Sequence, residues 1–111
     1  MSSRLSIMEA DTAFLSGHDL AVYSTTWCPD CTRLKRWLAT TGLATREVNI
    51  DEVEGAAEKL ERETGKRAIP FVLVDGVHWV RGYHKESRLR FDPALFLAEM
   101  RQVLASGDSE R

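Results

Sequence analysis

The chain has 111 residues, 43% of them hydrophobic and 29% charged, with a formal net charge of −2. This size and mix are typical of one globular domain, and the interleaved charges argue against a disordered chain, a nucleic-acid binder or a polybasic membrane anchor. No apolar run approaches the roughly 20 residues that span a bilayer, and acids interrupt the first residues, so we expect no signal peptide and a cytoplasmic protein.

The predicted elements alternate between strands and helices. Residues 1–18 are expected to form an extension, either a short helix or a loose tail, and 19–105 the domain itself. Apolar periodicity and β-branched runs predict, in chain order, a strand over 20–24, a helix over 29–40, a strand over 45–50, a helix over 51–64, strands over 69–74 and 77–80, and a helix from 93. Residues 106–111 are polar and are expected to be a frayed tail.

Several residues mark where these elements start and stop. Gly42 and Gly65 are natural helix ends, and Asp75-Gly76 is a strong hairpin signal. Asp92-Pro93 reads as a helix N-cap followed by a first-turn proline. The second helix is expected to turn four apolar residues inward: Val53, Ala56, Ala57 and Leu60.

The resulting order is β-α-β-α-β-β-α. A β-α-β start gives two parallel strands, and the hairpin at Asp75-Gly76 adds an antiparallel pair. We therefore predict an α/β fold in which helices cover both faces of a mixed four-stranded sheet.

The two cysteines, Cys28 and Cys31, lie at the junction of the first strand and the first long helix. A disulfide across so short a loop restrains little of the unfolded chain, which argues against a purely structural bridge. Cys28 falls at a helix N-terminus, where unpaired N–H groups and the helix dipole favour an anion, and cysteines so placed have pKa values of about 3.5–7.5. Cys31, almost one turn later, can reach back to Cys28. This placement predicts a reactive dithiol.

Metal binding is the competing interpretation of the cysteine pair. A tetrahedral zinc site would need two more ligands, and the histidines (His18, His78 and His84) are not paired at a usual ligand spacing. Pro29 stiffens the loop for a dithiol turn. An iron–sulfur cluster bridging two chains is a further alternative. We predict no bound metal or cofactor, the redox group being the Cys28–Cys31 disulfide itself.

Asp30 is an unusual residue to find between two reactive cysteines. Its carboxylate should oppose a thiolate at Cys28 and repel anionic substrates, so we expect Asp30→Asn to make Cys28 easier to ionise. Alternatively, Asp30 is a solvated first-turn acid that only complements the helix dipole.

Three segments in the right order resemble the glutaredoxin-like branch of the thioredoxin superfamily. They are Tyr23-Ser24-Thr25-Thr26-Trp27-Cys28-Pro29-Asp30-Cys31, Ala68-Ile69-Pro70 and Trp79-Val80-Arg81-Gly82-Tyr83. The resemblance runs from about residue 20 to about residue 89. It implies the thioredoxin-like three-layer α/β/α fold and the activity of a thiol–disulfide oxidoreductase.

The resemblance also gives each site residue a role. Cys28 matches the nucleophile and Cys31 the resolving cysteine. Pro70 matches the family's cis-proline, where the backbone of Ile69 would pair with an extended substrate; otherwise it is an ordinary edge-strand proline. Trp27 is either part of a docking surface or a tryptophan at the edge of the core. The residues expected to contact substrate are Trp27, Pro29, Ile69, Pro70, Gly82 and Tyr83.

Two subfamilies compete for the reductant. Glutathione-dependent glutaredoxins usually carry a basic residue three positions before the first cysteine, where this chain has Thr25, and an acid after a glycine turn, where it has His84 and Lys85. NrdH-type redoxins, which take electrons from thioredoxin reductase and NADPH, resemble the chain more closely around Gly82. We expect a monomer that reduces protein disulfides. The alternatives are removal of glutathione or another small thiol by Cys28 alone, a metal or cluster module, and a non-catalytic adaptor.

Overall fold

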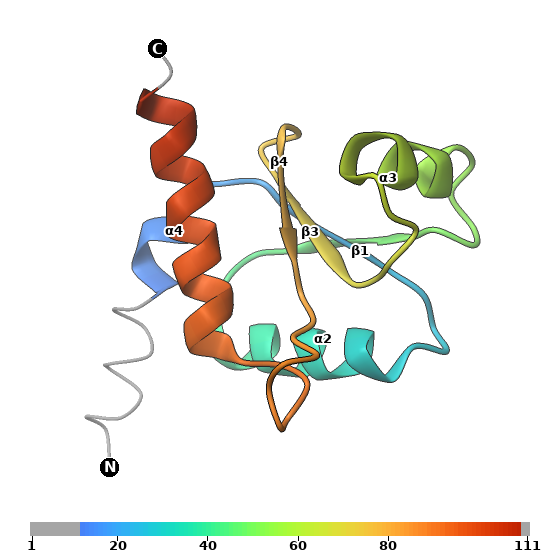
Figure 1. Cartoon of the computed structure of the whole chain (residues 1–111), viewed down its shortest axis with the longest axis horizontal. Helices are drawn as coiled ribbons and strands as arrows, with labels where there is room; N and C mark the ends of the chain where they lie inside the picture. Colours follow the sequence, from blue (N-terminus) through green and yellow to red (C-terminus); the bar gives the residue numbers. More distant parts are fainter. Residues whose placement is uncertain (1–11, 110–111) are drawn as a thin grey trace.

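The computed structural model describes residues 12–109 and has a four-stranded sheet at its centre (Figure 1). The strand order is β2-β1-β3-β4. β1 pairs in parallel with β2 and antiparallel with β3, and β3 pairs antiparallel with β4. The elements are η1 (Ala13–Leu15), β1 (Leu20–Ser24), α2 (Pro29–Thr41), β2 (Arg46–Asn49), α3 (Ala56–Thr64), β3 (Phe71–Val74), β4 (His78–Arg81) and α4 (Pro93–Ser109). The predicted mixed sheet is confirmed.

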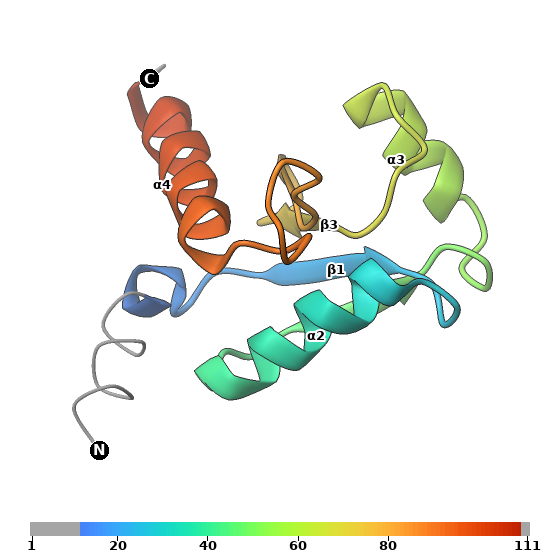
Figure 2. The same cartoon turned by 60° about the horizontal axis from the view of Figure 1, so that its bottom comes forward.

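Two hydrophobic clusters hold helices on opposite faces of this sheet. One cluster packs α2 and α4 on the strands through residues such as Leu34, Val72 and Phe96. The other joins α3 to the opposite face through residues such as Leu60 and Leu73. Figure 2 shows α2 below β1 with α3 on the other side of the sheet. The predicted three-layer α/β/α arrangement is therefore confirmed.

The predicted helix ends, hairpin turn and helix N-cap are found at the predicted residues. Gly42 and Gly65 end α2 and α3 with left-handed φ angles of 77° and 79°. Asp75 and Gly76 both have positive φ in the turn that joins β3 to β4, and the N–H of Val77 donates to the carbonyl of Val74 at 3.1 Å. The Asp92 carboxylate accepts a hydrogen bond from the N–H of Leu95 at 3.2 Å, and α4 then begins at Pro93.

The start of the second long helix was predicted wrongly. The Asn49 side chain accepts a hydrogen bond from the N–H of Asp51 at 2.9 Å, which closes a separate turn after β2. Gly55, with a φ of 83°, then breaks the chain direction, and α3 begins only at Ala56. Val53 consequently lies on a turn and is 48% exposed instead of pointing inward.

The predicted extension and tail differ in part from the structure. Of the predicted extension 1–18, residues 1–11 lie outside the described residues, and Leu15 of η1 is buried in the core. α4 runs to Ser109, into the range expected to be a tail. Within residues 12–109, no helix combines the length and apolarity needed to cross a bilayer.

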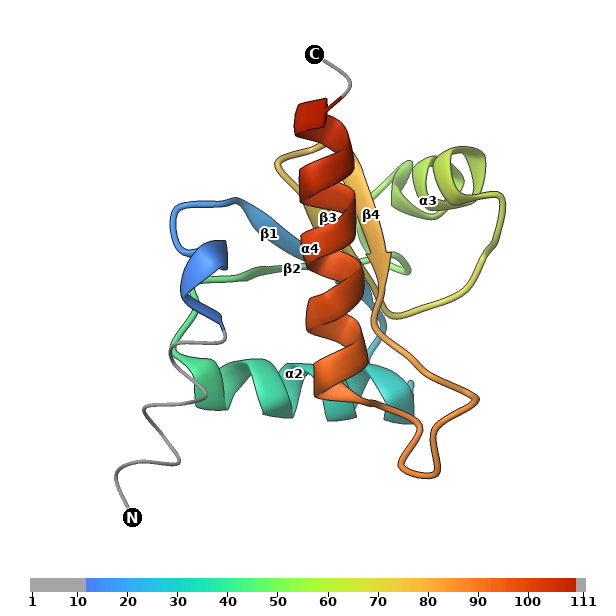
Figure 3. The ribbon, with the colours of Figure 1, turned by 60° about the vertical axis from the view of Figure 1, so that its left-hand side comes forward.

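A loop over 82–92 joins β4 to α4 and lies beside the N-terminal half of α2 (Figure 3). It is closed by backbone hydrogen bonds, from the N–H of His84 to the carbonyl of Arg90 at 2.8 Å and from the N–H of Arg90 to the carbonyl of Ser87 at 3.0 Å. The imidazole Nδ1 of His84 accepts a further hydrogen bond from the N–H of Asp92 at 3.1 Å. The loop is thus a folded unit.

Candidate active site

The two cysteines lie at the first turn of α2, next to the end of β1. Cys28 is the N-cap residue, and its sulfur accepts a hydrogen bond from the backbone N–H of Cys31 at 3.1 Å. Pro29 occupies the first helical position, where no N–H is needed. Such a donor at a helix N-terminus stabilises negative charge on the Cys28 sulfur.

Cys31 is chemically distinct from its neighbour. It is fully buried, whereas Cys28 keeps 6% of its surface exposed. Burial, and then the hydrogen bond to Cys28, raise the pKa of the Cys31 thiol to about 12. Cys31 therefore stays protonated at neutral pH, which leaves Cys28 as the sulfur able to attack first.

The buried thiol predicts a pH dependence of stability for the reduced protein. The unfolded chain releases the Cys31 proton near an ordinary cysteine pKa of about 8.5, while the folded chain keeps it up to about 12. The free energy of unfolding should therefore fall as pH rises through this window. Urea denaturation of the reduced protein at pH 7 to 10.5 measures this free energy. Cys31→Ser is the control, because it removes the part of the pH dependence that comes from Cys31. An equal slope in Cys31→Ser would contradict the assignment.

Pro70 and Gly82 form the next part of the site. The Ile69–Pro70 bond is cis, as the resemblance implied. The N–H of Gly82 donates to the carbonyl of Pro70 at 2.8 Å. A side chain at Gly82 has no room, because its Cβ would lie 2.6 Å from Cδ2 of Leu34 and 3.3 Å from the Pro70 ring. The sequence-predicted residues Pro70 and Gly82 are therefore brought together, against α2.

Trp27 lies on the surface beside the cysteines. Its side chain is 68% exposed, so a position at the edge of the core is wrong, and its indole N–H donates to the Asp51 carboxylate at 2.8 Å. Trp27 and Ile69 share one hollow of about 610 Å³. Most of its other lining residues come from the turn after β2 and the start of α3, and four are acidic: Asp51, Glu52, Glu54 and Glu58.

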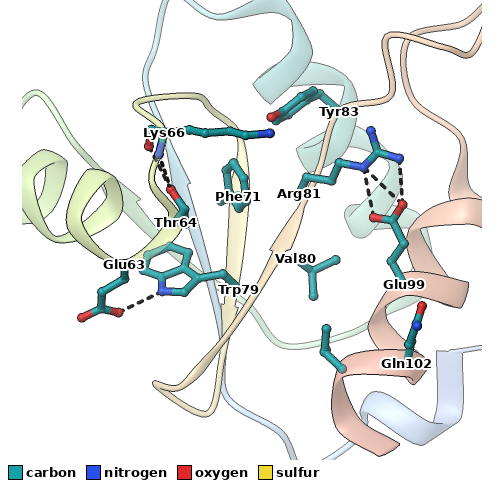
Figure 4. Close-up of a pocket in the computed structure, with 11 residues that line it drawn as sticks. Glu63, Thr64, Lys66, Phe71, Trp79, Val80, Arg81, Tyr83, Glu99 and Gln102 are labelled. Atoms are coloured by element: carbon teal, nitrogen blue, oxygen red, sulfur yellow. Dashed lines mark hydrogen bonds and ion pairs between the residues drawn. The ribbon is translucent and has the colours of Figure 1, made fainter. Parts of the chain in front are cut away.

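Tyr83 faces away from this hollow. Its ring packs edge-on against Phe71, with 5.8 Å between ring centroids, and only 8% of the residue is exposed. It lines a separate hollow of about 560 Å³ between α3 and α4, where Lys66 extends over Phe71 toward it and Arg81 binds Glu99 (Figure 4). Trp27 and Ile69 do not line this second hollow and Tyr83 does not line the first, so the structure does not bring Tyr83 together with the Trp27 side of the site.

Asp30 is not a free carboxylate. The Arg90 guanidinium binds it through two hydrogen bonds, Nε to Oδ1 at 3.1 Å and Nη2 to Oδ2 at 3.0 Å, and Arg33 binds it from the next turn of α2. Arg90 is the main reason that the pKa of Asp30 is lowered. The alternative of a solvated acid is therefore wrong, whereas the expected effect of Asp30→Asn on Cys28 stays a prediction. Sequence reasoning missed Arg90, because no spacing pattern links two residues 60 positions apart.

The histidines lie in separate places. His18 binds Asp75 near the β3–β4 hairpin, and His84 is fully buried in the 82–92 loop, where burial lowers its pKa. Across residues 12–109 no three His, Cys, Asp or Glu side chains gather as metal ligands would.

Comparisons with known proteins point to one family. A family model described as glutaredoxin matches residues 20–79. Glutaredoxin-C2 of Arabidopsis thaliana is 31% identical over 79% of the chain and 81% of its own length. Glutaredoxin-C4, chloroplastic, of rice is 33% identical over 65% of the chain and 58% of its own length, so the chain matches less than two thirds of that relative. The glutaredoxin-like protein NrdH of Lactococcus lactis is 39% identical over 50% of the chain and 76% of its own length.

Solved structures give the same answer for the fold. A glutaredoxin of Archaeoglobus fulgidus has a TM-score of 0.52 and 26% identity, covering 67% of this chain and 85% of that protein. The reduced glutaredoxin C1 of Populus tremula x tremuloides has a TM-score of 0.52 and 25% identity, covering 73% of this chain and 72% of that protein. Glutaredoxins are thiol–disulfide oxidoreductases that need no bound cofactor. With its fold, its cysteine pair at a helix N-terminus and its cis-proline, the chain belongs to the glutaredoxin family.

Proposed function

We propose that the protein is a dithiol redoxin that reduces disulfides in other proteins through Cys28 and Cys31. The observation that supports this most directly is the pairing of an N-cap Cys28, which accepts the N–H of Cys31, with a fully buried and protonated Cys31. The proposal includes NADPH and thioredoxin reductase as the source of electrons, a monomeric protein and the cytoplasm as its compartment.

The proposed reaction has two exchange steps. The Cys28 thiolate attacks one sulfur of the target disulfide, which forms a mixed disulfide and releases the other target sulfur as a thiolate. Cys31 then gives up its proton, which the released thiolate takes, and attacks the Cys28 sulfur. The second target thiolate leaves and is protonated by solvent, and the Cys28–Cys31 disulfide remains. Two electrons from the reductant and two protons from solvent return it to the dithiol.

The acidic hollow next to Trp27 favours a protein disulfide over a small anionic thiol. All four of its acidic residues are exposed on the surface, and Glu52, Glu54 and Glu58 do not share the hydrogen bond that Asp51 makes with Trp27. Its lone arginine, Arg67, already binds Glu61. A thiol of the glutathione type carries two carboxylates, which this surface repels, whereas a neutral or basic protein segment meets no such barrier.

A glutathione-dependent activity that uses Cys28 alone is the second candidate. The similarity to glutaredoxins named as such in plants and bacteria favours it. In that reaction the Cys28 thiolate attacks the glutathione sulfur of a mixed disulfide on a target protein, and the target sulfur leaves as a thiolate. A second thiol then attacks the glutathione sulfur, which forms a small disulfide and releases Cys28 as a thiolate. Cys31 would not be needed.

NADPH consumption at 340 nm separates the two candidates. The oxidised protein is incubated with NADPH and thioredoxin reductase, and in parallel with NADPH, glutathione and glutathione reductase. We expect rapid turnover with thioredoxin reductase only. Turnover with glutathione only would reject the proposed reductant in favour of the second candidate. No turnover in either assay would reject both reductants, and metal analysis of the purified protein would then test the zinc and iron–sulfur alternatives.

The hollow also predicts how a variant should behave. Glu54→Gln combined with Glu58→Gln removes two negative charges beside Trp27, so reduction of the protein by glutathione should become about 2- to 5-fold faster at low salt. The gain should shrink at high salt, where exposed charges are screened. Glu63→Gln, on α3 outside the hollow, is the matched control. Equal rates in the double variant and the parent would show that the hollow does not select against anionic thiols.

A further inference from the structure

The contact between Asp30 and Arg90 joins two distant parts of the chain at the redox site. Arg90 reaches the first turn of α2 from the 82–92 loop and holds both carboxylate oxygens of Asp30. Its backbone has a φ of 65°, a left-handed conformation that is unfavourable for a residue other than glycine. Hydrogen bonds to His84 and Ser87 hold the backbone there. Strain held in this way at a functional site points to a role for the side chain.

The charge of Asp30 makes this role specific. Asp30 is two residues from Cys28, its side chain is only 17% exposed, and its lowered pKa keeps it ionised at neutral pH. An unopposed carboxylate at this point would disfavour a thiolate on Cys28. Two guanidinium groups, those of Arg90 and Arg33, bind it instead.

Arg90 and Arg33 differ in how firmly they hold the Asp30 carboxylate. Arg33 is an i, i+3 neighbour on the same helix, and ion pairs of that kind are weak. Arg90 binds with a planar two-point contact that sets the orientation of the carboxylate as well as its charge.

The loop also connects the two sides of the site. It begins at Gly82, whose N–H binds the Pro70 carbonyl, and Arg90 lies two residues before its end, bound to Asp30. Figure 3 shows the loop reaching from the end of β4 to the N-terminal part of α2. One short segment therefore contacts both the cis-proline and the cysteine turn.

We propose that Arg90 is a positioning residue of the redox site, which orients Asp30 and cancels its charge so that Cys28 can form its thiolate beside a carboxylate. The inference rests on the proposed function only in treating Cys28 as the nucleophile. It gives Asp30 and Arg90 one joint role, and it predicts that neither residue acts independently of the other.

The test is a double-mutant cycle on the reactivity of Cys28. The four proteins are the parent, Arg90→Gln, Asp30→Asn and the double variant, all in a Cys31→Ser background so that only one thiol reacts. Alkylation by iodoacetamide between pH 5 and 9 measures the thiolate fraction, and absorbance at 240 nm follows its formation directly. Arg88→Gln, an exposed arginine of the same loop, is the matched control.

We expect Arg90→Gln to slow alkylation at pH 7 by about 3- to 10-fold and to move thiolate formation to higher pH. Asp30→Asn should speed alkylation, and in the Asp30→Asn background Arg90→Gln should have less than half of its effect. Arg88→Gln should behave like the parent. A role in folding alone would give the same loss in both backgrounds, and that result, or no loss in Arg90→Gln, would overturn the proposal.

A further variant covers the outcome in which Arg90→Gln does not fold. Arg90→Lys keeps a positive charge next to Asp30 but loses the two-point contact, and it should retain most of the alkylation rate. A rate as low as that expected for Arg90→Gln would contradict the electrostatic role. Because alkylation needs neither reductase nor target protein, a negative result in the NADPH assay leaves this test intact, and the two failures can be told apart.

Discussion

Cys28→Ser is expected to abolish disulfide reduction, and Cys31→Ser is expected to stop it after the first exchange. In Cys28→Ser the more accessible of the two sulfurs is gone, and the fully buried Cys31 with its pKa of about 12 cannot replace it. In Cys31→Ser the mixed disulfide on Cys28 has no nearby thiol to resolve it. The measurement is reduction of a protein disulfide with NADPH and thioredoxin reductase.

The state of the trapped protein distinguishes the mechanisms. Mass spectrometry of Cys31→Ser without reductant should show the target attached to Cys28, and dithiothreitol should release it. Thr32→Ser, a conservative change at the next residue, should turn over like the parent and controls for disturbance of the helix start. If Cys31→Ser keeps the full rate with glutathione as reductant, the dithiol mechanism is wrong and the one-cysteine alternative holds.

Gly82→Ala should destabilise the protein and slow catalysis together. The new Cβ would lie 2.6 Å from Cδ2 of Leu34 and 3.3 Å from the Pro70 carbonyl oxygen. Leu34 is fully buried in α2 and cannot swing into solvent. Overpacking of this kind costs about 1–3 kcal/mol, and relief of the clash would push Pro70 out of place. Urea denaturation measures the free energy of unfolding, and the NADPH assay measures the rate.

A second change tests whether the clash is the cause. Leu34→Ala removes the atom that Gly82→Ala would meet, although it is itself destabilising by about 2–5 kcal/mol. Gly82→Ala should therefore cost less free energy of unfolding in the Leu34→Ala background than in the parent. An equal cost in both backgrounds would mean that contact with Leu34 is not what excludes a side chain at position 82.

Most of the fold could be predicted because residues with special backbone preferences stand at the ends of its helices and strands. Gly42, Gly65, Asp75-Gly76 and Asp92-Pro93 each mark an end or a turn that the structure has at the same place. The start of α3 could not be predicted, because Asp51 and the residues after it suit a helix and only Gly55 interrupts that pattern. A left-handed glycine inside an apolar pattern gives a weak signal.

The candidate site divides in the same way. The cysteines and Pro70 follow from local motifs, and the structure has the expected N-cap and cis bond. The partners of Asp30 and Trp27 do not follow from local motifs. Arg90 and Asp51 reach these two residues from other parts of the chain through exposed side chains. Their pairing depends on the path of two loops, which the period of a helix or strand does not encode.

The buried face of α2 has a consequence for any attempt to reduce this protein to a minimal fragment. The glutaredoxin family model covers residues 20–79, yet the cluster that supports α2 also contains Leu15, Phe91, Phe96 and Met100, all outside that range. A fragment limited to 20–79 would leave one side of Leu34 and Leu38 open to water. During synthesis the catalytic turn would likewise lack its final support until the last helix had emerged, so the redox centre should be among the last parts of the domain to become rigid.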